Sequence, residues 1–80
     1  MGYHKAKIKK GEKGELSKVL EEVMEAIDAD DQRCKLMTLM ELSDVIGAIH
    51  LYLKKHHPTL TITDMVKMAL ITESAFEDGE

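Results

Sequence analysis

The segment from Leu36 to Leu53, LMTLMELSDVIGAIHLYL, constrains the fold more than any other part of the chain. Its apolar residues surround a helical wheel instead of keeping to one side of it. A helix of this kind has to be covered on all sides, and a chain of 80 residues has little material with which to cover it. We therefore expect a long central helix over residues 31–55, ended by Pro58, at the centre of an assembly of several copies. The apolar positions are Leu36, Met37, Leu39, Met40, Leu42, Val45, Ile46, Ala48, Ile49, Leu51 and Leu53.

A shorter helix is predicted on each side of this segment. Residues 15–28 and 62–77 both carry apolar residues at spacings of three and four, which is typical of amphipathic helices. TITD, residues 61–64, resembles a capping box, and DADD, residues 28–31, is expected to end the first helix and cap the second. Period-two strand patterning is missing, so the predicted class is all-α, with three helices per chain assembling as a helical-bundle homo-oligomer, a dimer or a tetramer.

Charge and cysteine content narrow the possible partners. The net charge is −4, yet residues 1–13 hold five lysines against one glutamate. We interpret residues 1–13 as a basic arm and residues 14–80 as a single helical domain. A basic arm on an acidic body argues against binding to nucleic acid. One cysteine, no signal-peptide pattern and no uninterrupted apolar run of ~18 residues favour a cytoplasmic protein without a membrane partner.

Two acids interrupt the apolar central helix. Glu41 and Asp44 stand three residues apart and share a helix face, and Glu22 and Glu25 repeat this spacing on the first helix. If the two helices are antiparallel neighbours, four carboxylates can converge on one point. Such an oxygen-rich group suits Mg²⁺ or Mn²⁺. The alternative is that these acids are solvated helix faces, an interpretation that fits the first pair better than the second, whose helix is apolar.

A second register competes for the first pair. Glu12 and Glu15 also stand three residues apart and precede the same ELSD segment. We prefer Glu22 and Glu25, because the apolar spacing around them is helical, whereas Gly11 interrupts the earlier stretch.

The two acidic segments, LEEVMEAIDA and ELSDVIGAI, resemble the MazG-like, all-α nucleoside triphosphate pyrophosphohydrolases. The signature of that family is ExxE, a spacer and then ExxD on the next helix. SKVLEEVMEA is also similar to the related phosphoribosyl-ATP pyrophosphohydrolases. The resemblance covers residues 15–53, about half of the chain. It implies an enzyme that uses Mg²⁺, or Mn²⁺, to hydrolyse a nucleoside triphosphate, NTP or dNTP, to the monophosphate and pyrophosphate.

The resemblance also implies a role for each matching residue. The expected metal ligands and catalytic residues are Glu22, Glu25, Glu41 and Asp44, with Glu21 and Asp28 supporting them and Lys18, Lys5 and Lys7 meeting substrate phosphates. One departure matters: the third predicted helix offers only Lys67 where fuller members carry several basic or amide residues. This departure leaves a second function open, a non-catalytic protein that binds or sequesters a nucleotide.

Overall fold

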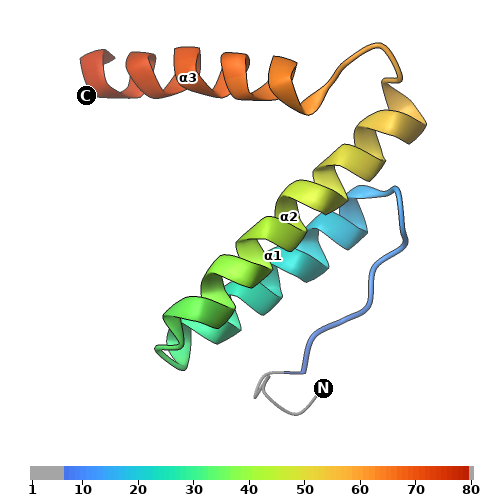
Figure 1. Cartoon of the computed structure of the whole chain (residues 1–80), viewed down its shortest axis with the longest axis vertical. Helices are drawn as coiled ribbons and strands as arrows, with labels where there is room; N and C mark the ends of the chain where they lie inside the picture. The colour runs from blue at the N-terminus through green and yellow to red at the C-terminus, as the bar shows by residue number, and fades with distance from the viewer. Residues whose placement is uncertain (1–6, 80) are drawn as a thin grey trace.

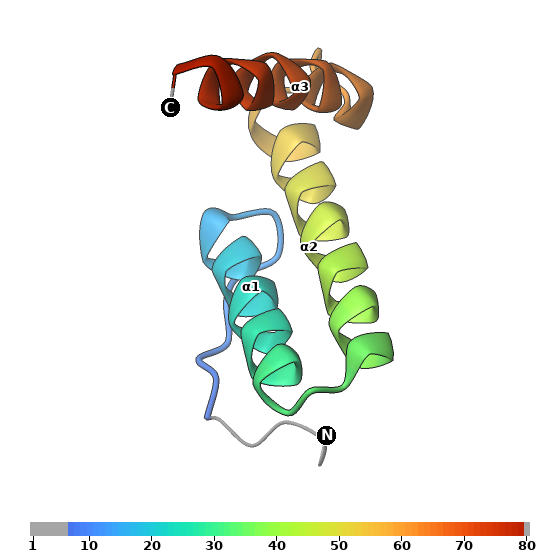
Figure 2. The ribbon, with the colours of Figure 1, turned by 90° about the vertical axis from the view of Figure 1, so that its left-hand side faces the viewer.

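A computed structural model of the chain describes residues 7–79 and contains three α-helices in that range. They are α1 (Leu16–Asp31), α2 (Lys35–His56) and α3 (Ile62–Gly79). Helices α1 and α2 lie side by side as an antiparallel hairpin, whereas α3 turns away at the far end of α2 (Figures 1 and 2). The all-α class with a long central helix, 22 residues in α2, is confirmed.

The turn between α1 and α2 differs from the prediction. Helix α1 continues to Asp31, so DADD lies inside its last turns and does not cap α2. Arg33 adopts a positive φ of 60°, and the amides of Arg33 and Cys34 donate to the carbonyls of Asp30 and Ala29. This pattern is a Schellman motif, which usually places glycine at the left-handed position. Because this residue is an arginine, the sequence did not predict the motif.

The start of α3 follows the predicted capping box. The Thr61 amide donates to Asp64 Oδ2 at 3.0 Å, and the Asp64 amide donates to Thr61 Oγ1 at 3.1 Å. The two side chains therefore satisfy backbone donors that the first turn of a helix leaves without partners.

The interior of the hairpin holds small and acidic residues instead of large apolar ones. Among the described residues, the buried apolar side chains are Ala26, Ala29, Ala48 and Leu53. The predicted apolar stripe of the first helix does not face α2: Leu20 is 60% exposed and Ile27 is 49% exposed. The other large exposed apolar side chains are Leu16, Met24, Leu36, Leu39, Met40, Leu42, Ile46, Leu60, Val66, Met68, Leu70, Ile71 and Phe76.

Helix α2 is also long and apolar enough to cross a membrane, judged by length and composition, with 22 residues and a mean hydropathy of 1.4 over its best window. The expectation that the protein has no membrane partner stays a prediction. The same test is passed by core helices of soluble proteins. Glu41 and Asp44 lie within α2, and ionised carboxylates are costly in a bilayer.

Three polar side chains join the start of α1 to the end of α2. Glu15, the residue before α1, pairs with Lys55, and its other carboxylate oxygen lies 3.0 Å from His56 Nε2. Hydrogen bonds from Lys55 and then His56 lower the pKa of Glu15 below its ordinary value. The hairpin is thus closed by a charged cluster at its open end.

This cluster predicts a pH dependence of stability. A carboxylate whose pKa is lowered by folding stabilises the folded state above its unfolded pKa, and this contribution is lost as pH falls through the folded value. We expect Glu15→Gln to lower the thermal midpoint at pH 7 and to match the unsubstituted protein once acid has protonated Glu15. Thermal melts from pH 7 to pH 3 measure the difference. A constant difference across that range would contradict the prediction, and Glu73→Gln on the exposed face of α3 is the control.

Candidate metal centre

Three carboxylates meet between α1 and α2. Oxygen atoms of Glu22, Glu41 and Asp44 all lie within 4.8 Å of one another. Glu22 is 7% exposed and Glu41 only 1%, whereas Asp44 lies at the exposed side of the group. The antiparallel hairpin therefore brings three of the four predicted ligands together, two of them inside the protein.

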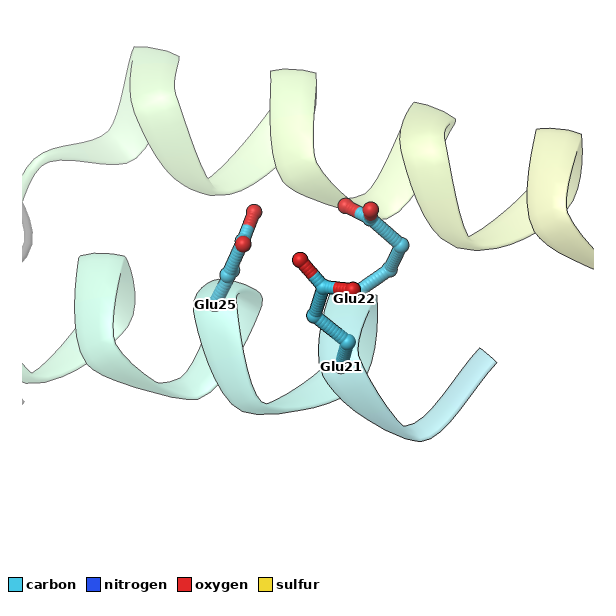
Figure 3. Close-up of side chains that lie close together, drawn as sticks. All are labelled: Glu21, Glu22 and Glu25. Carbon is cyan, nitrogen blue, oxygen red and sulfur yellow. The ribbon is translucent and has the colours of Figure 1, made fainter. Parts of the chain in front are cut away.

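The fourth predicted ligand belongs to an adjoining group. Glu25 forms a second set with Glu21 and Glu22, again with oxygen atoms within 4.8 Å of one another. Figure 3 shows Glu22 and Glu25 extending from α1 toward α2, with the Glu21 carboxylate between them in this view. Glu22 belongs to both sets and so links the five acids. We name this set, Glu21, Glu22, Glu25, Glu41 and Asp44, the acidic group.

Small residues allow the helices to approach at this point. Ala26 follows Glu22 by four residues, Ala29 follows it by seven, and Ala48 stands in the same relation to Asp44 and Glu41. Residues four and seven apart share a helix face, so each acid pair and its alanines lie on the side turned to the other helix. All three alanines are buried. Alanines that follow an acid by four and seven residues were the sequence signal for the side of each helix that faces the other helix.

The neighbouring acids make Asp44 harder to ionise. Loss of surrounding solvent, followed by the charges of Glu22 and Glu41, raises the pKa of Asp44 above its ordinary value. A hydrogen bond that Asp44 shares with Glu41 acts in the same direction. Several negative charges in one desolvated place attract a cation, because opposite charge offsets both the repulsion and the desolvation.

Lys18 supplies one positive charge to the acidic group. Its Nζ atom lies 3.0 Å from Glu22 Oε2 and 3.1 Å from Glu21 Oε1. Hydrogen bonds to Glu22 and Glu21 raise the pKa of Lys18 above its ordinary value, so it remains protonated. The structure thus places Lys18 beside the predicted ligands, where an ammonium group can also meet a phosphate.

Glu21 has a second set of contacts that the sequence did not reveal. The Gly11 amide donates to Glu21 Oε1 at 2.9 Å, and Lys10 Nζ lies 3.6 Å from Oε2. The Gly11 amide is the largest cause that lowers the pKa of Glu21, and Lys18 acts in the same direction. Glu21, predicted only as a supporting residue, therefore anchors the preceding segment to α1. The glycine at residue 11 was the sequence signal for this contact.

The remaining predicted residues take different places. Asp28 is buried and accepts a hydrogen bond from Gln32 Nε2 at 3.0 Å, but it belongs to neither set of clustered oxygens. Lys7 lies before α1 on the segment that packs against it, and Lys5 lies outside the described residues. The competing register is not brought to the acids of α2, because Glu15 pairs with Lys55 and His56.

Comparison with known proteins gives no relative: no protein family, no curated protein and no solved structure matches this chain.

Proposed function

We propose that this protein hydrolyses a nucleoside triphosphate, NTP or dNTP, to the monophosphate and pyrophosphate with the help of Mg²⁺. The observation that carries the proposal is the convergence of Glu22, Glu41 and Asp44 within 4.8 Å inside the hairpin. Burying acids while large apolar side chains remain exposed is unfavourable in the absence of a compensating charge. A cation held between these acids would offset this cost.

The donors fit a hard divalent cation. The acidic group offers carboxylate oxygens alone, and both Mg²⁺ and Mn²⁺ prefer oxygen ligands. Glu22, Glu25, Glu41 and Asp44 would hold the ion, whose chemistry is to screen phosphate charge and to make a bound water more acidic. The donor set includes no imidazole or thiolate, which zinc would favour.

The protein's own residues have separate parts in the proposed reaction. Hydrolysis breaks the bond between the α-phosphate and the bridging oxygen to the β-phosphate, and water supplies the new oxygen. Asp44 is the candidate acceptor of the water's proton, through a carboxylate oxygen that the ion leaves free, because it lies at the exposed side of the group where water can reach it. Lys18 meets the negative charge of the phosphates from the neighbouring turn of α1.

The proposal includes assembly as a homodimer, with a tetramer as the larger alternative. The accessible surface is 6312 Å², about 1,500 Å² more than a compact chain of 9.0 kDa is expected to expose. A standard interface buries roughly 800 Å² on each partner, and obligate homodimers bury more. Large exposed apolar side chains lie on all three helices, α1, α2 and α3. A second copy has the same apolar surface, so it can pair with it about a twofold axis.

Thermal stability tests metal binding without any substrate. We expect Mg²⁺ to raise the unfolding midpoint of the metal-free protein, by the equivalent of about 2.7 kcal/mol at a hundred times the dissociation constant. Glu41→Gln should abolish this increase, because it removes a buried donor from the group. Calorimetric melts with and without Mg²⁺ measure both. Glu73→Gln, on the exposed part of α3, is the matched control and should respond like the unsubstituted protein. An equal response of Glu41→Gln would contradict the proposed ligands.

A further inference from the structure

A cavity lies between the segment before α1 and α1 itself. It has a volume of about 330 Å³ and is lined on one side by residues 7–10 and on the other by Ser17, Leu20, Glu21 and Met24 of α1, so apolar side chains form part of its wall. Three of the four residues on the first side are lysines: Lys7, Lys9 and Lys10. We call this space the lysine cavity.

Close contacts hold the lysine cavity together. The Gly11 amide donates to Glu21 Oε1 at 2.9 Å, and the Glu12 amide donates to Ser17 Oγ at 2.9 Å. A Cβ atom at residue 11 would lie 2.1 Å from the carbonyl oxygen of Ser17, which is far inside van der Waals contact. Only glycine therefore lets the segment approach α1 this closely.

The residues that line the cavity include more basic than acidic side chains, although the chain is acidic. Against three lysines it has one carboxylate, Glu21, which is already engaged by the Gly11 amide and by Lys18. The side chain of Lys10 is 86% exposed, so its ammonium group can turn toward a ligand without losing buried contacts. Grouped positive charge in a concave place raises the local concentration of anions.

The cavity adjoins the acidic group, because Glu21 belongs to both. An anion with several linked phosphate groups can contact more than one of the three lysines at the same time, whereas a single phosphate contacts fewer of them. We propose that the lysine cavity binds a chain of phosphates, either free pyrophosphate or the phosphate tail of a nucleotide. Its role beside the hydrolytic site rests on the proposed function; the binding of pyrophosphate itself does not.

Calorimetric titration of the full chain with pyrophosphate, in buffer with EDTA and no Mg²⁺, tests this site. We expect the combined substitution Lys7→Gln, Lys9→Gln and Lys10→Gln to weaken binding at least about tenfold. The control combines Lys13→Gln, Lys54→Gln and Lys67→Gln, three exposed lysines that do not line the cavity. It removes the same net charge and should change binding by less than about twofold. Gly11→Ala keeps every lysine but displaces the segment, and should also weaken binding about tenfold or more.

Each contrary outcome overturns a defined part of the proposal. Equal weakening by both triple substitutions would show attraction by net charge alone, and no binding by the unsubstituted protein would remove the site. Orthophosphate binding as tightly as pyrophosphate would exclude a phosphate chain as the ligand, and unchanged binding by Gly11→Ala would exclude the role of the close contact. Parallel titrations with ATP and pyrophosphate distinguish a nucleotide tail from the free anion. Because Mg²⁺ is left out, failure here is distinct from failure of the metal site.

Discussion

Replacing Glu41 by Gln is expected to reduce Mg²⁺-dependent release of pyrophosphate by at least about 100-fold, the upper range for losing even a supporting partner of a metal ligand. Gln keeps the shape of the side chain but removes the negative charge at the most deeply buried acid of the group. The measurement is a phosphate assay with added inorganic pyrophosphatase, run over the four NTPs and four dNTPs.

Two controls make this result specific. Glu73→Gln removes a carboxylate from the exposed surface of α3 and should leave the rate unchanged. Circular dichroism of Glu41→Gln should show that its helices are intact. Undiminished release by Glu41→Gln would overturn the catalytic proposal. Tight nucleotide binding by the unsubstituted protein without release from any nucleotide would instead support the alternative of a sequestering protein on the same fold.

Placing two charges in the apolar groove of the hairpin is expected to dissociate the assembly. The groove lies between α1 and α2, has a volume of about 290 Å³, and is lined by Val23, Ile27, Leu42 and Val45 among others. Burying an aliphatic side chain contributes about 1.5–3 kcal/mol, so the double substitution Ile27→Glu and Leu42→Glu should raise the dissociation constant at least 100-fold, about 2.8 kcal/mol. Sedimentation equilibrium measures this constant, with the unsubstituted protein expected at twice its 9.0 kDa chain mass or more.

A control with the same change in net charge separates burial from repulsion. Lys35→Gln combined with Thr59→Glu alters two exposed polar positions, one at the start of α2 and one in the loop before α3. It should leave the assembly intact. A monomeric unsubstituted protein at micromolar concentration would contradict the proposed homodimer. If that monomer also bound lipid vesicles, the exposed apolar surface would be explained by a membrane.

The helices themselves follow from local sequence, but the direction in which α1 faces does not. Apolar spacing predicts three helices, and the Thr61–Asp64 capping box places the start of α3 correctly. The same spacing correctly separates Leu20 and Ile27 from Glu22 on α1. It carries no information about which side meets α2, because an apolar stripe can be covered by the same chain or by another copy.

The sequence predicted which acids meet between the helices, but not the contacts that they make with residues outside the helices. Spacing and the antiparallel arrangement bring Glu22, Glu41 and Asp44 together, as expected. The link from Gly11 to Glu21 depends on the path of a segment outside the helices, for which helical periodicity gives no rule. The left-handed Arg33 was missed for a similar reason, because residue preference at that position favours glycine strongly but not exclusively.

The hairpin supplies Glu22, Glu41 and Asp44 from a single chain. Each copy in an assembly would therefore carry its own complete set of these three donors, whatever the number of copies. The ion capacity should then be counted per chain. An assembly that mixed intact and substituted chains would lose capacity in proportion to the substituted fraction, whereas a centre built across the boundary would lose it more steeply.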